Sequence, residues 1–160
     1  MIMGLDYKVQ TASEEEMFSH LQACSNYFTP PLHERLDVAT YASKLRKYAI
    51  TFEAWDNREL VGLIAAYLND ESSKIGFISN VSVCSEYTGK GIASRLLDMT
   101  ITYARDRSFI QMRIETIVDN FAAINLYEKF QFKIYDRNDA LIKMAYPIST
   151  NSQLLKKDRT

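Results

Sequence analysis

The segment from Val81 to Leu97 combines two glycines, a lysine and the beginning of a helical pattern. Gly89 and Gly91 allow unusual backbone angles and the close approach of a ligand. The first N–H groups and the dipole of the following helix favour an anion, and Lys90 adds a positive charge. The segment therefore predicts a phosphate-binding loop, and the alternative is an ordinary strand-to-helix turn that uses glycine for steric ease.

The spacing of this loop disfavours two common classes of nucleotide site. A P-loop needs four residues between its glycines and a Gly-Lys-Ser/Thr ending, whereas only Lys90 separates Gly89 from Gly91. The segment also differs from the G-x-G-x-x-G motif of dinucleotide-binding folds. A nucleoside triphosphate or a dinucleotide is therefore not the expected ligand.

A second segment, Asn120 to Phe132, places an amide and a phenol on one helical face. Asn120 and Tyr127 are two helical turns apart, with Ala123 and Ile124 between them on that face. If the face lines a cleft, the Tyr127 hydroxyl can give or take a proton and Asn120 can hold a ligand through hydrogen bonds. If the face packs in the core, Tyr127 is a buried aromatic whose hydroxyl is satisfied.

The hydrophobic pattern predicts the elements that position these segments. Strands are expected at 5–9, 49–55, 60–68, 75–84, 110–118, 132–135 and 140–146. Helices are expected after Thr11 or Ser13 as far as Thr29-Pro30-Pro31, from Asp37 onward, at 92–106 and at 120–130. Along the strand at 75–84, alternation predicts that Phe77, Ser79, Val81 and Val83 share one side. The order of elements predicts a mixed α/β (α+β) fold with helices on both faces of a sheet.

Composition and charge limit the class of protein. The chain has 160 residues, 47% of them hydrophobic, which fits one domain over residues 1–147 followed by a polar tail at 148–160. The formal net charge of -1 argues against a nucleic-acid partner. The N-terminal residues show no secretion signal, and every apolar run falls short of the ~20 residues that a membrane span requires, so we expect a cytoplasmic protein.

The cysteines and histidines indicate no metal site. The spacing of Cys24 and Cys84 fits neither a CxxC pair nor a zinc site, so both are expected to be reduced core thiols. His20 and His33 are expected to be surface residues.

Together, the two chemistry-bearing segments resemble the GNAT superfamily of acyl-CoA-dependent N-acyltransferases. The Q/R-x-x-G-x-G/A segment of that family is matched by Thr88-Gly89-Lys90-Gly91-Ile92-Ala93. Its later Asn-x-x-Ala-x-x-x-Tyr-Glu-Lys-x-Gly-Phe segment is matched by Asn120, Ala123, Tyr127, Glu128, Lys129 and Phe132. Two positions depart from the family pattern, since Thr88 replaces Gln or Arg and Gln131 replaces Gly.

The resemblance implies a central, mostly antiparallel mixed sheet, and acetyl-CoA as a co-substrate without a metal. It implies that the strand backbone at Val81, Ser82 and Val83 binds the pantetheine arm and the thioester carbonyl. It also implies pyrophosphate binding by the loop from Gly89 to Ser94, a segment that includes Lys90, Gly91, Ile92 and Ala93, with Thr88 and Asn120 completing the cofactor site. In such proteins an amine attacks the thioester directly, and Tyr127 is the residue that would protonate the departing thiolate.

Glu115, on the strand at 110–118, is the predicted carboxylate for the acceptor amine, either as a base through water or as an ammonium anchor. The alternative is that Glu115 pairs with a cation such as Arg113 or Lys133. Asn80, Glu53 and Tyr67 are further candidates to face the acceptor.

The leading functional hypothesis is acetyl transfer to a primary amine of a small molecule. Two alternatives stay open: acetylation of a protein at its N-terminus or a lysine, and a non-catalytic acyl-CoA-binding module. The last strands and the tail could support a homodimer or merely fray.

Overall fold

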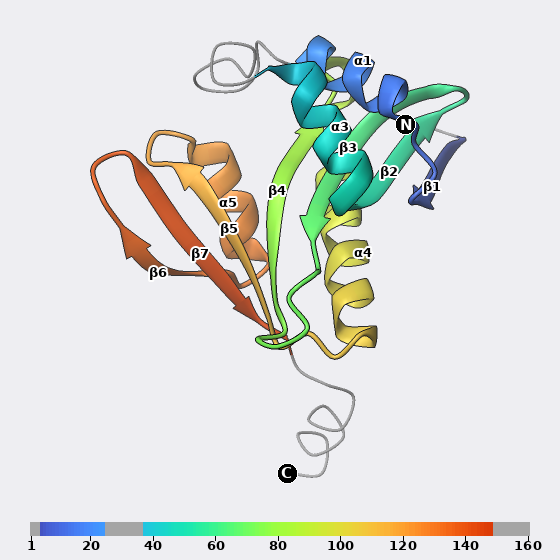
Figure 1. Cartoon of the computed structure of the whole chain (residues 1–160). Coiled ribbons are helices and arrows are strands. Elements are labelled where there is room, and N and C mark those ends of the chain that lie inside the picture. The colour runs from blue at the N-terminus through green and yellow to red at the C-terminus, as the bar shows by residue number, and fades with distance from the viewer. Residues whose placement is uncertain (1–3, 25–36, 149–160) are drawn as a thin grey trace.

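A single sheet runs through the computed structural model, which describes residues 4–24 and 37–148 (Figure 1). Within these ranges the strand order is β1-β2-β3-β4-β5-β7-β6. Every neighbouring pair is antiparallel except β4 and β5, which are parallel. The prediction of a mixed, mostly antiparallel sheet is therefore confirmed. The strands are β1 (Leu5–Val9), β2 (Ile50–Asp56), β3 (Glu59–Tyr67), β4 (Ile75–Val83), β5 (Gln111–Ile117), β6 (Lys133–Arg137) and β7 (Leu141–Pro147).

Helices cover both faces of this sheet, as predicted (Figure 1). On one face, α1 (Glu14–Cys24) and α3 (Val38–Tyr48) bury Met17, Leu21, Ala42 and Leu45 against β2 and β3. On the other face, α4 (Ile92–Asp106) and α5 (Phe121–Lys129) contribute Leu96, Leu97, Ile101 and Tyr127 to the larger core cluster. Among the helices in the described ranges, none has the length and apolar character needed to cross a membrane.

Side-chain caps fix where the first two of these helices begin. The Ser13 hydroxyl accepts a hydrogen bond from the Glu16 N–H at 3.1 Å, and the Glu16 carboxylate accepts one from the Ser13 N–H at 2.9 Å. The Asp37 carboxylate accepts a hydrogen bond from the Ala39 N–H at 3.2 Å at the start of α3. The predicted caps at Ser13 and Asp37 are confirmed, whereas the predicted helix stop at Thr29-Pro30-Pro31 lies outside the described residues.

A β-bulge interrupts β4 and corrects one prediction. Ile78 pairs with Ala66 and Asn80 pairs with Ala65, so Ser79 has no partner on β3. The Ser79 hydroxyl lies 2.5 Å from the Tyr41 hydroxyl of α3, whereas Val81 packs in the core cluster that contains α4. Ser79 and Val81 therefore point to opposite faces, and the predicted uniform alternation along this strand is wrong. An unpaired residue in a bulge reverses the side-chain alternation and bends the strand.

Candidate functional site

The most open part of the sheet is the gap between β4 and β5. These parallel strands pair only over Ile75–Ile78 and Gln111–Ile114, and beyond that point they diverge (Figure 1). A cavity of about 630 Å³ lies in the divergence. One edge of residues 79–83 has no neighbouring strand there, so backbone N–H and C=O groups on that edge can bind a ligand.

The cavity brings together many of the residues that the sequence predicted for the site. Tyr127 and Glu115 both line it, although they belong to different elements. Six of the predicted cofactor-binding residues also line it, namely Val81, Ser82, Val83, Thr88, Ala93 and Asn120. Gly89, Lys90, Gly91, Ile92 and Ser94 are not among the lining residues. Thr88 and Ala93, which flank residues 89–92 in the sequence, do line the cavity, so the glycine loop continues the cavity lining toward the protein surface.

The glycine loop has the backbone conformation that its sequence suggests. Gly89 has a φ of +75° and Gly91 has a φ of +83°, and a Cβ built at either position meets no other atom within 4 Å. Gly91 caps α4, and its carbonyl accepts a hydrogen bond from the Arg95 N–H at 3.0 Å. The N–H groups of Ile92, Ala93 and Ser94, which precede this first bond of α4, are therefore open to an anion.

A short 3-10 turn, η2 (Ser85–Tyr87), holds the beginning of this loop. The Thr88 hydroxyl donates a hydrogen bond to the Ser85 carbonyl at 2.9 Å, so this hydroxyl stabilises the turn. The Tyr87 hydroxyl donates a hydrogen bond to the Asp56 carboxylate at the end of β2. This hydrogen bond raises the pKa of Tyr87 to about 12. The first contact stabilises the turn, and the second fixes the turn to the end of β2.

Tyr127 presents its phenol to the cavity from an otherwise buried position. The residue is 5% exposed, and its ring centroid lies 5.9 Å from that of Phe132. Burial raises the pKa of Tyr127 above its usual value, because the phenolate loses solvation. Within the part of the chain that the structure describes, its hydroxyl makes no hydrogen bond. A protonated phenol at the cavity wall can donate its proton to a ligand.

Both ends of α5 hold Tyr127 in place. The Asn120 side chain accepts a hydrogen bond from the Ala123 N–H at 3.2 Å, so Asn120 is the N-cap of the helix and not its first turn. Gln131, just beyond α5, has a φ of +73°. This residue therefore keeps the left-handed conformation for which the family pattern uses glycine.

Glu115 pairs with a cation, but not with either of those suggested by the sequence. Its Oε1 lies 4.0 Å from the Nζ of Lys143 on β7. Arg113 instead donates a hydrogen bond to the Gln111 side chain at 2.6 Å. The Glu115 side chain is 38% exposed and lines the cavity, so its carboxylate can also reach a ligand.

Two of the three further acceptor-side candidates lie away from the cavity. Asn80 lines it, whereas Glu53 and Tyr67 do not. Glu53 is fully buried, and its carboxylate accepts hydrogen bonds from the Ala12 N–H at 3.1 Å and the Trp55 indole at 3.0 Å. Its role is structural, because buried carboxylates are stable only when donors surround them.

The expectation that His20 is a surface residue is wrong. His20 is 3% exposed, with Nδ1 3.0 Å from the Leu60 carbonyl oxygen and Nε2 2.8 Å from the Ser82 hydroxyl. His33, the other histidine, lies outside the described residues. Helical spacing with Met17 and Cys24 is the signal that could have placed His20 on the buried face of α1.

Several lining residues were not predicted from the sequence. They include Cys24, Ser79, Thr116 and Leu141. Thr116 adjoins Glu115 on β5, but alternation points neighbouring residues to opposite faces, so this pattern gives no signal for it. The other three come from separate elements, and only the folded topology brings them to the cavity.

Comparison with known proteins agrees with this geometry. The model of the acetyltransferase (GNAT) family matches residues 14–132. The chain is 26% identical over 165 residues to N-alpha-acetyltransferase 30 of Saccharomyces cerevisiae, covering 94% of this chain and 92% of that protein. It is 30% identical over 89 residues to N-alpha-acetyltransferase 30 of Schizosaccharomyces pombe, a match that spans 54% of this chain and 59% of that protein. A match to streptothricin acetyltransferase of Escherichia coli is 32% identical and covers 52% of this chain and 47% of that protein.

Solved structures share the fold at low sequence identity. The PaiA N-acetyltransferase from Thermoplasma acidophilum in complex with coenzyme A has a TM-score of 0.73 at 15% identity, covering 91% of this chain and 99% of that chain. A chain of the NatC complex bound to Gag peptide and CoA has a TM-score of 0.71 at 24% identity, covering 92% of this chain and 100% of that chain. These likenesses support the same arrangement of strands and helices.

Proposed function

Because the chain belongs to the acetyltransferase (GNAT) family of acetyl-CoA-dependent N-acetyltransferases, we propose that it transfers an acetyl group from acetyl-CoA to a primary amine. The observation that carries this proposal is the cavity between β4 and β5, where an unpaired strand edge meets the phenol of Tyr127. The strand edge can bind an extended ligand through its backbone, and the Tyr127 phenol supplies a proton donor beside that ligand. The combination of the two fits an acyl-CoA-dependent acetyltransferase.

The geometry fits the parts of acetyl-CoA. The open N–H groups at the start of α4, together with the loop from Thr88 to Gly91, suit the pyrophosphate. The β4 edge at Val81, Ser82 and Val83 suits the pantetheine arm, which needs backbone hydrogen bonds along an extended path. The volume of about 630 Å³ lies in the range typical of small-molecule sites.

The proposed chemistry is direct attack by a neutral amine on the thioester carbonyl. A backbone N–H near Val83 stabilises the oxyanion of the tetrahedral intermediate. Tyr127 donates its proton to the thiolate as the thioester bond breaks. Glu115 holds the acceptor ammonium or removes its proton through water.

The acceptor class that the relatives favour is the α-amino group of a polypeptide. The match to the Saccharomyces cerevisiae N-alpha-acetyltransferase covers most of both chains, whereas the streptothricin acetyltransferase match covers about half of each. A small amine, the acceptor predicted from the sequence, is the second candidate, and the streptothricin match favours it. A polypeptide acceptor needs an open groove for its chain, whereas a small amine does not.

The remaining expectations are also proposals. We propose one domain over residues 1–147, although Ile148 also joins the fold, with its N–H donating to the Ile110 carbonyl at 2.9 Å. A cytoplasmic location is supported by two free, buried cysteines, because disulfides are rare in reducing compartments. The proposal includes no nucleic-acid or membrane partner, and a homodimer is tested by measuring the mass in solution.

A thermal-shift titration with acetyl-CoA, CoA and ATP tests the cofactor. A ligand that binds only the folded state stabilises it by about 2.7 kcal/mol at ~100 times its Kd. We expect stabilisation by acetyl-CoA and CoA but not by ATP. If folded protein responds to neither CoA species, the glycine loop is only a structural turn and the proposal is wrong.

A CoA-release assay then separates the acceptors. Peptides with a free α-amine are compared with the same peptides carrying a blocked N-terminus and an internal lysine, and with amino sugars and polyamines. Turnover only with the free α-amine supports the first candidate, and turnover only with small amines supports the second. Acetyl-CoA binding without turnover across all acceptors would identify a non-catalytic binding module.

A further inference from the structure

His20, Cys24 and Cys84 form a buried cluster between α1 and the end of β4. One ring nitrogen of His20 and the Sγ atoms of Cys24 and Cys84 lie within 4.8 Å of one another. His20 Nε2 is 3.8 Å from the Cys24 Sγ, and His20 Nδ1 is 3.7 Å from the Cys84 Sγ. The three residues are 3%, 1% and 8% exposed, and both thiols are free. The fold therefore places two thiols and an imidazole in contact, although the sequence separates the thiols widely.

The geometry of His20 argues against a metal ion at this cluster. A metal-bound imidazole directs a ring lone pair at the ion. Here Nδ1 lies 3.0 Å from the Leu60 carbonyl oxygen and Nε2 lies 2.8 Å from the Ser82 hydroxyl. Both ring nitrogens are thus directed at protein oxygens. The cluster is therefore better suited to reactions of its thiols than to binding a metal ion.

The two thiols differ in acidity. Hydrogen bonds from the Cys24 thiol and from His20 lower the pKa of Cys84, against the opposing effects of burial and Glu86. The hydrogen bond to Cys84, with burial, raises the pKa of Cys24. Cys84 is therefore the thiol that reacts as a thiolate, and Cys24 keeps its proton.

Each thiol can be reached by a small molecule. Cys24 lines the cavity between β4 and β5. Cys84 and His20 line a second cavity of about 330 Å³, together with Glu16, Arg58 and Glu59. A molecule the size of a peroxide can enter either cavity.

We propose that Cys24 and Cys84 form a dithiol that hydrogen peroxide converts to an intrachain disulfide. The Cys84 thiolate attacks one peroxide oxygen, the O–O bond breaks, and Cys84 becomes a sulfenic acid. The second oxygen leaves as hydroxide and becomes water by taking up the proton that Cys84 released when it ionised. The Cys24 sulfur then attacks the Cys84 sulfur, the S–O bond breaks, and the Cys24 proton leaves with the hydroxide as a second water. Two thiols are oxidised, one peroxide is reduced, and two water molecules are released.

The disulfide would also act on the proposed acetyl-CoA site. Cys84 follows Val83 directly, and Cys24 lines the cavity, so a bond between the two sulfurs pulls the end of α1 toward the end of β4. We expect oxidised protein to bind acetyl-CoA more weakly than reduced protein. This consequence rests on the proposed function, whereas disulfide formation does not.

The test treats the reduced, folded chain with equimolar hydrogen peroxide and measures its intact mass. We expect each chain to lose two hydrogens, both cysteines to resist alkylation after denaturation, and dithiothreitol to reverse both changes. Cys24→Ser should give no disulfide, and dimedone should capture a sulfenic acid at Cys84. Cys84→Ser should stay reduced for longer than the wild type.

Three results would overturn the proposal. Both cysteines could remain open to alkylation after peroxide treatment, or disulfides could form only between chains. Metal analysis of the purified protein could instead find about one zinc per chain, lost in both serine variants. Failure of acetyl-CoA to bind reduced protein would count against the proposed function alone, because intact mass reports the disulfide independently.

Discussion

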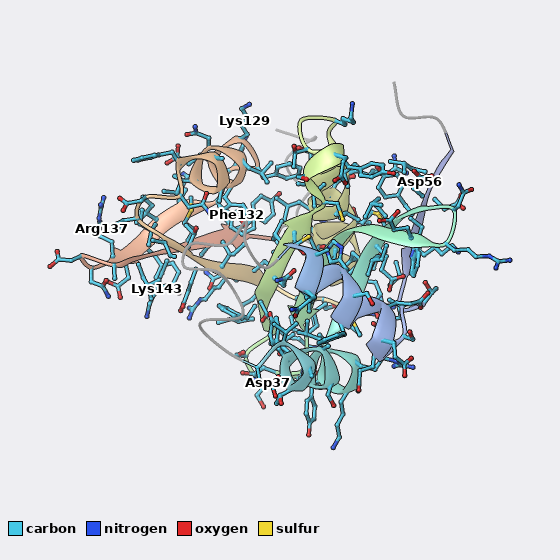
Figure 2. The ribbon with its side chains drawn as sticks, turned by 90° about the horizontal axis from the view of Figure 1, so that it is seen from above. Asp37, Asp56, Lys129, Phe132, Arg137 and Lys143 are labelled. Carbon is cyan, nitrogen blue, oxygen red and sulfur yellow. The ribbon has the colours of Figure 1, made fainter. Side chains whose placement is uncertain are left out.

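Glu115 on β5 lies directly opposite Lys143 on β7, with 4.0 Å between the Glu115 Oε1 and the Lys143 Nζ. Seen from above, Lys143 lies on the side of the molecule formed by β6 and β7, far from Asp56 (Figure 2). Both side chains are more than one-third exposed, and exposed ion pairs contribute only about 0–1 kcal/mol. Glu115 can therefore exchange Lys143 for the ammonium group of an acceptor at little cost.

Glu115→Gln should raise the KM for the acceptor amine about tenfold and change kcat less. A hydrogen bond to a charged group contributes about 1.5–3 kcal/mol, and ~1.4 kcal/mol corresponds to a factor of ten. Steady-state kinetics with a saturating acyl donor measure this split. Lys143→Gln is the matched control, since it breaks the same ion pair but should leave the KM unchanged. An unaltered KM in both variants would mean that Glu115 forms only a surface ion pair and does not bind the acceptor.

Tyr127→Phe should lower kcat by ~10²–10⁴, the usual contribution of a positioned proton donor. Because the phenol donates its proton only as the thioester bond breaks, its loss should leave the Kd of acetyl-CoA nearly constant while slowing turnover. Single-turnover acetyl transfer with an accepted amine measures the effect. Tyr135→Phe, on the exposed strand β6, controls for removal of a hydroxyl elsewhere. Wild-type rates in Tyr127→Phe with every acceptor would exclude Tyr127 from the mechanism.

The hydrogen bond between Tyr87 and Asp56 should make the Tyr87 phenol lose its proton at an unusually high pH. The pKa of Tyr87 is raised from 10 to about 12, because the Asp56 carboxylate accepts a hydrogen bond from the phenol and repels the phenolate. A raised pKa means that the folded protein holds the proton more tightly, so this contribution to stability is complete below about pH 10 and is lost as the pH rises through about 12. Phenolate absorbance, recorded as wild type minus Tyr87→Phe, measures the pKa. In the Asp56→Asn background, the pKa of Tyr87 measured in the same way should move back toward 10.

Local patterns are sufficient for much of the fold. The stripe of Val38, Ala42 and Leu45 predicts α3, because a period near 3.6 residues places these side chains on one face. The glycine loop is equally local, since Gly89 and Gly91 adopt the positive φ values that glycine tolerates.

Long-range relationships could not be predicted from such patterns. The bulge at Ser79 depends on the register between β3 and β4, and alternation alone gives no sign of it. Glu115 meets Lys143 because β7 lies between β5 and β6 in the sheet, an order that differs from the order along the chain. The contact between His20 and Cys84 likewise arises only when α1 packs over β4.

Gln131→Gly should stabilise the protein by about 0.5–1 kcal/mol. Gln131 has a φ of +73°, a conformation that costs a residue with a Cβ roughly 1–2 kcal/mol, and the greater freedom of glycine in the unfolded chain offsets part of the gain. Urea unfolding should show a higher midpoint with an unchanged slope. Gln131→Ala retains the Cβ and should show no gain. A midpoint that falls in the glycine variant would mean that contacts of the Gln131 side chain outweigh the strain.

Gly91→Ala should weaken acetyl-CoA binding about tenfold with only a modest loss of stability. Gly91 has a φ of +83°, and an added Cβ meets no atom within 4 Å, so backbone strain of roughly 1–2 kcal/mol is the main cost. The chain can relieve this strain by turning the loop, which would move the N–H groups of Ile92, Ala93 and Ser94 away from the pyrophosphate. Calorimetric titration with acetyl-CoA and urea unfolding separate the two effects. Gly4→Ala is the matched control, because Gly4 has a φ of +85° and equally open surroundings but lies outside the cavity lining. If both variants keep wild-type affinity, the start of α4 does not bind the phosphates.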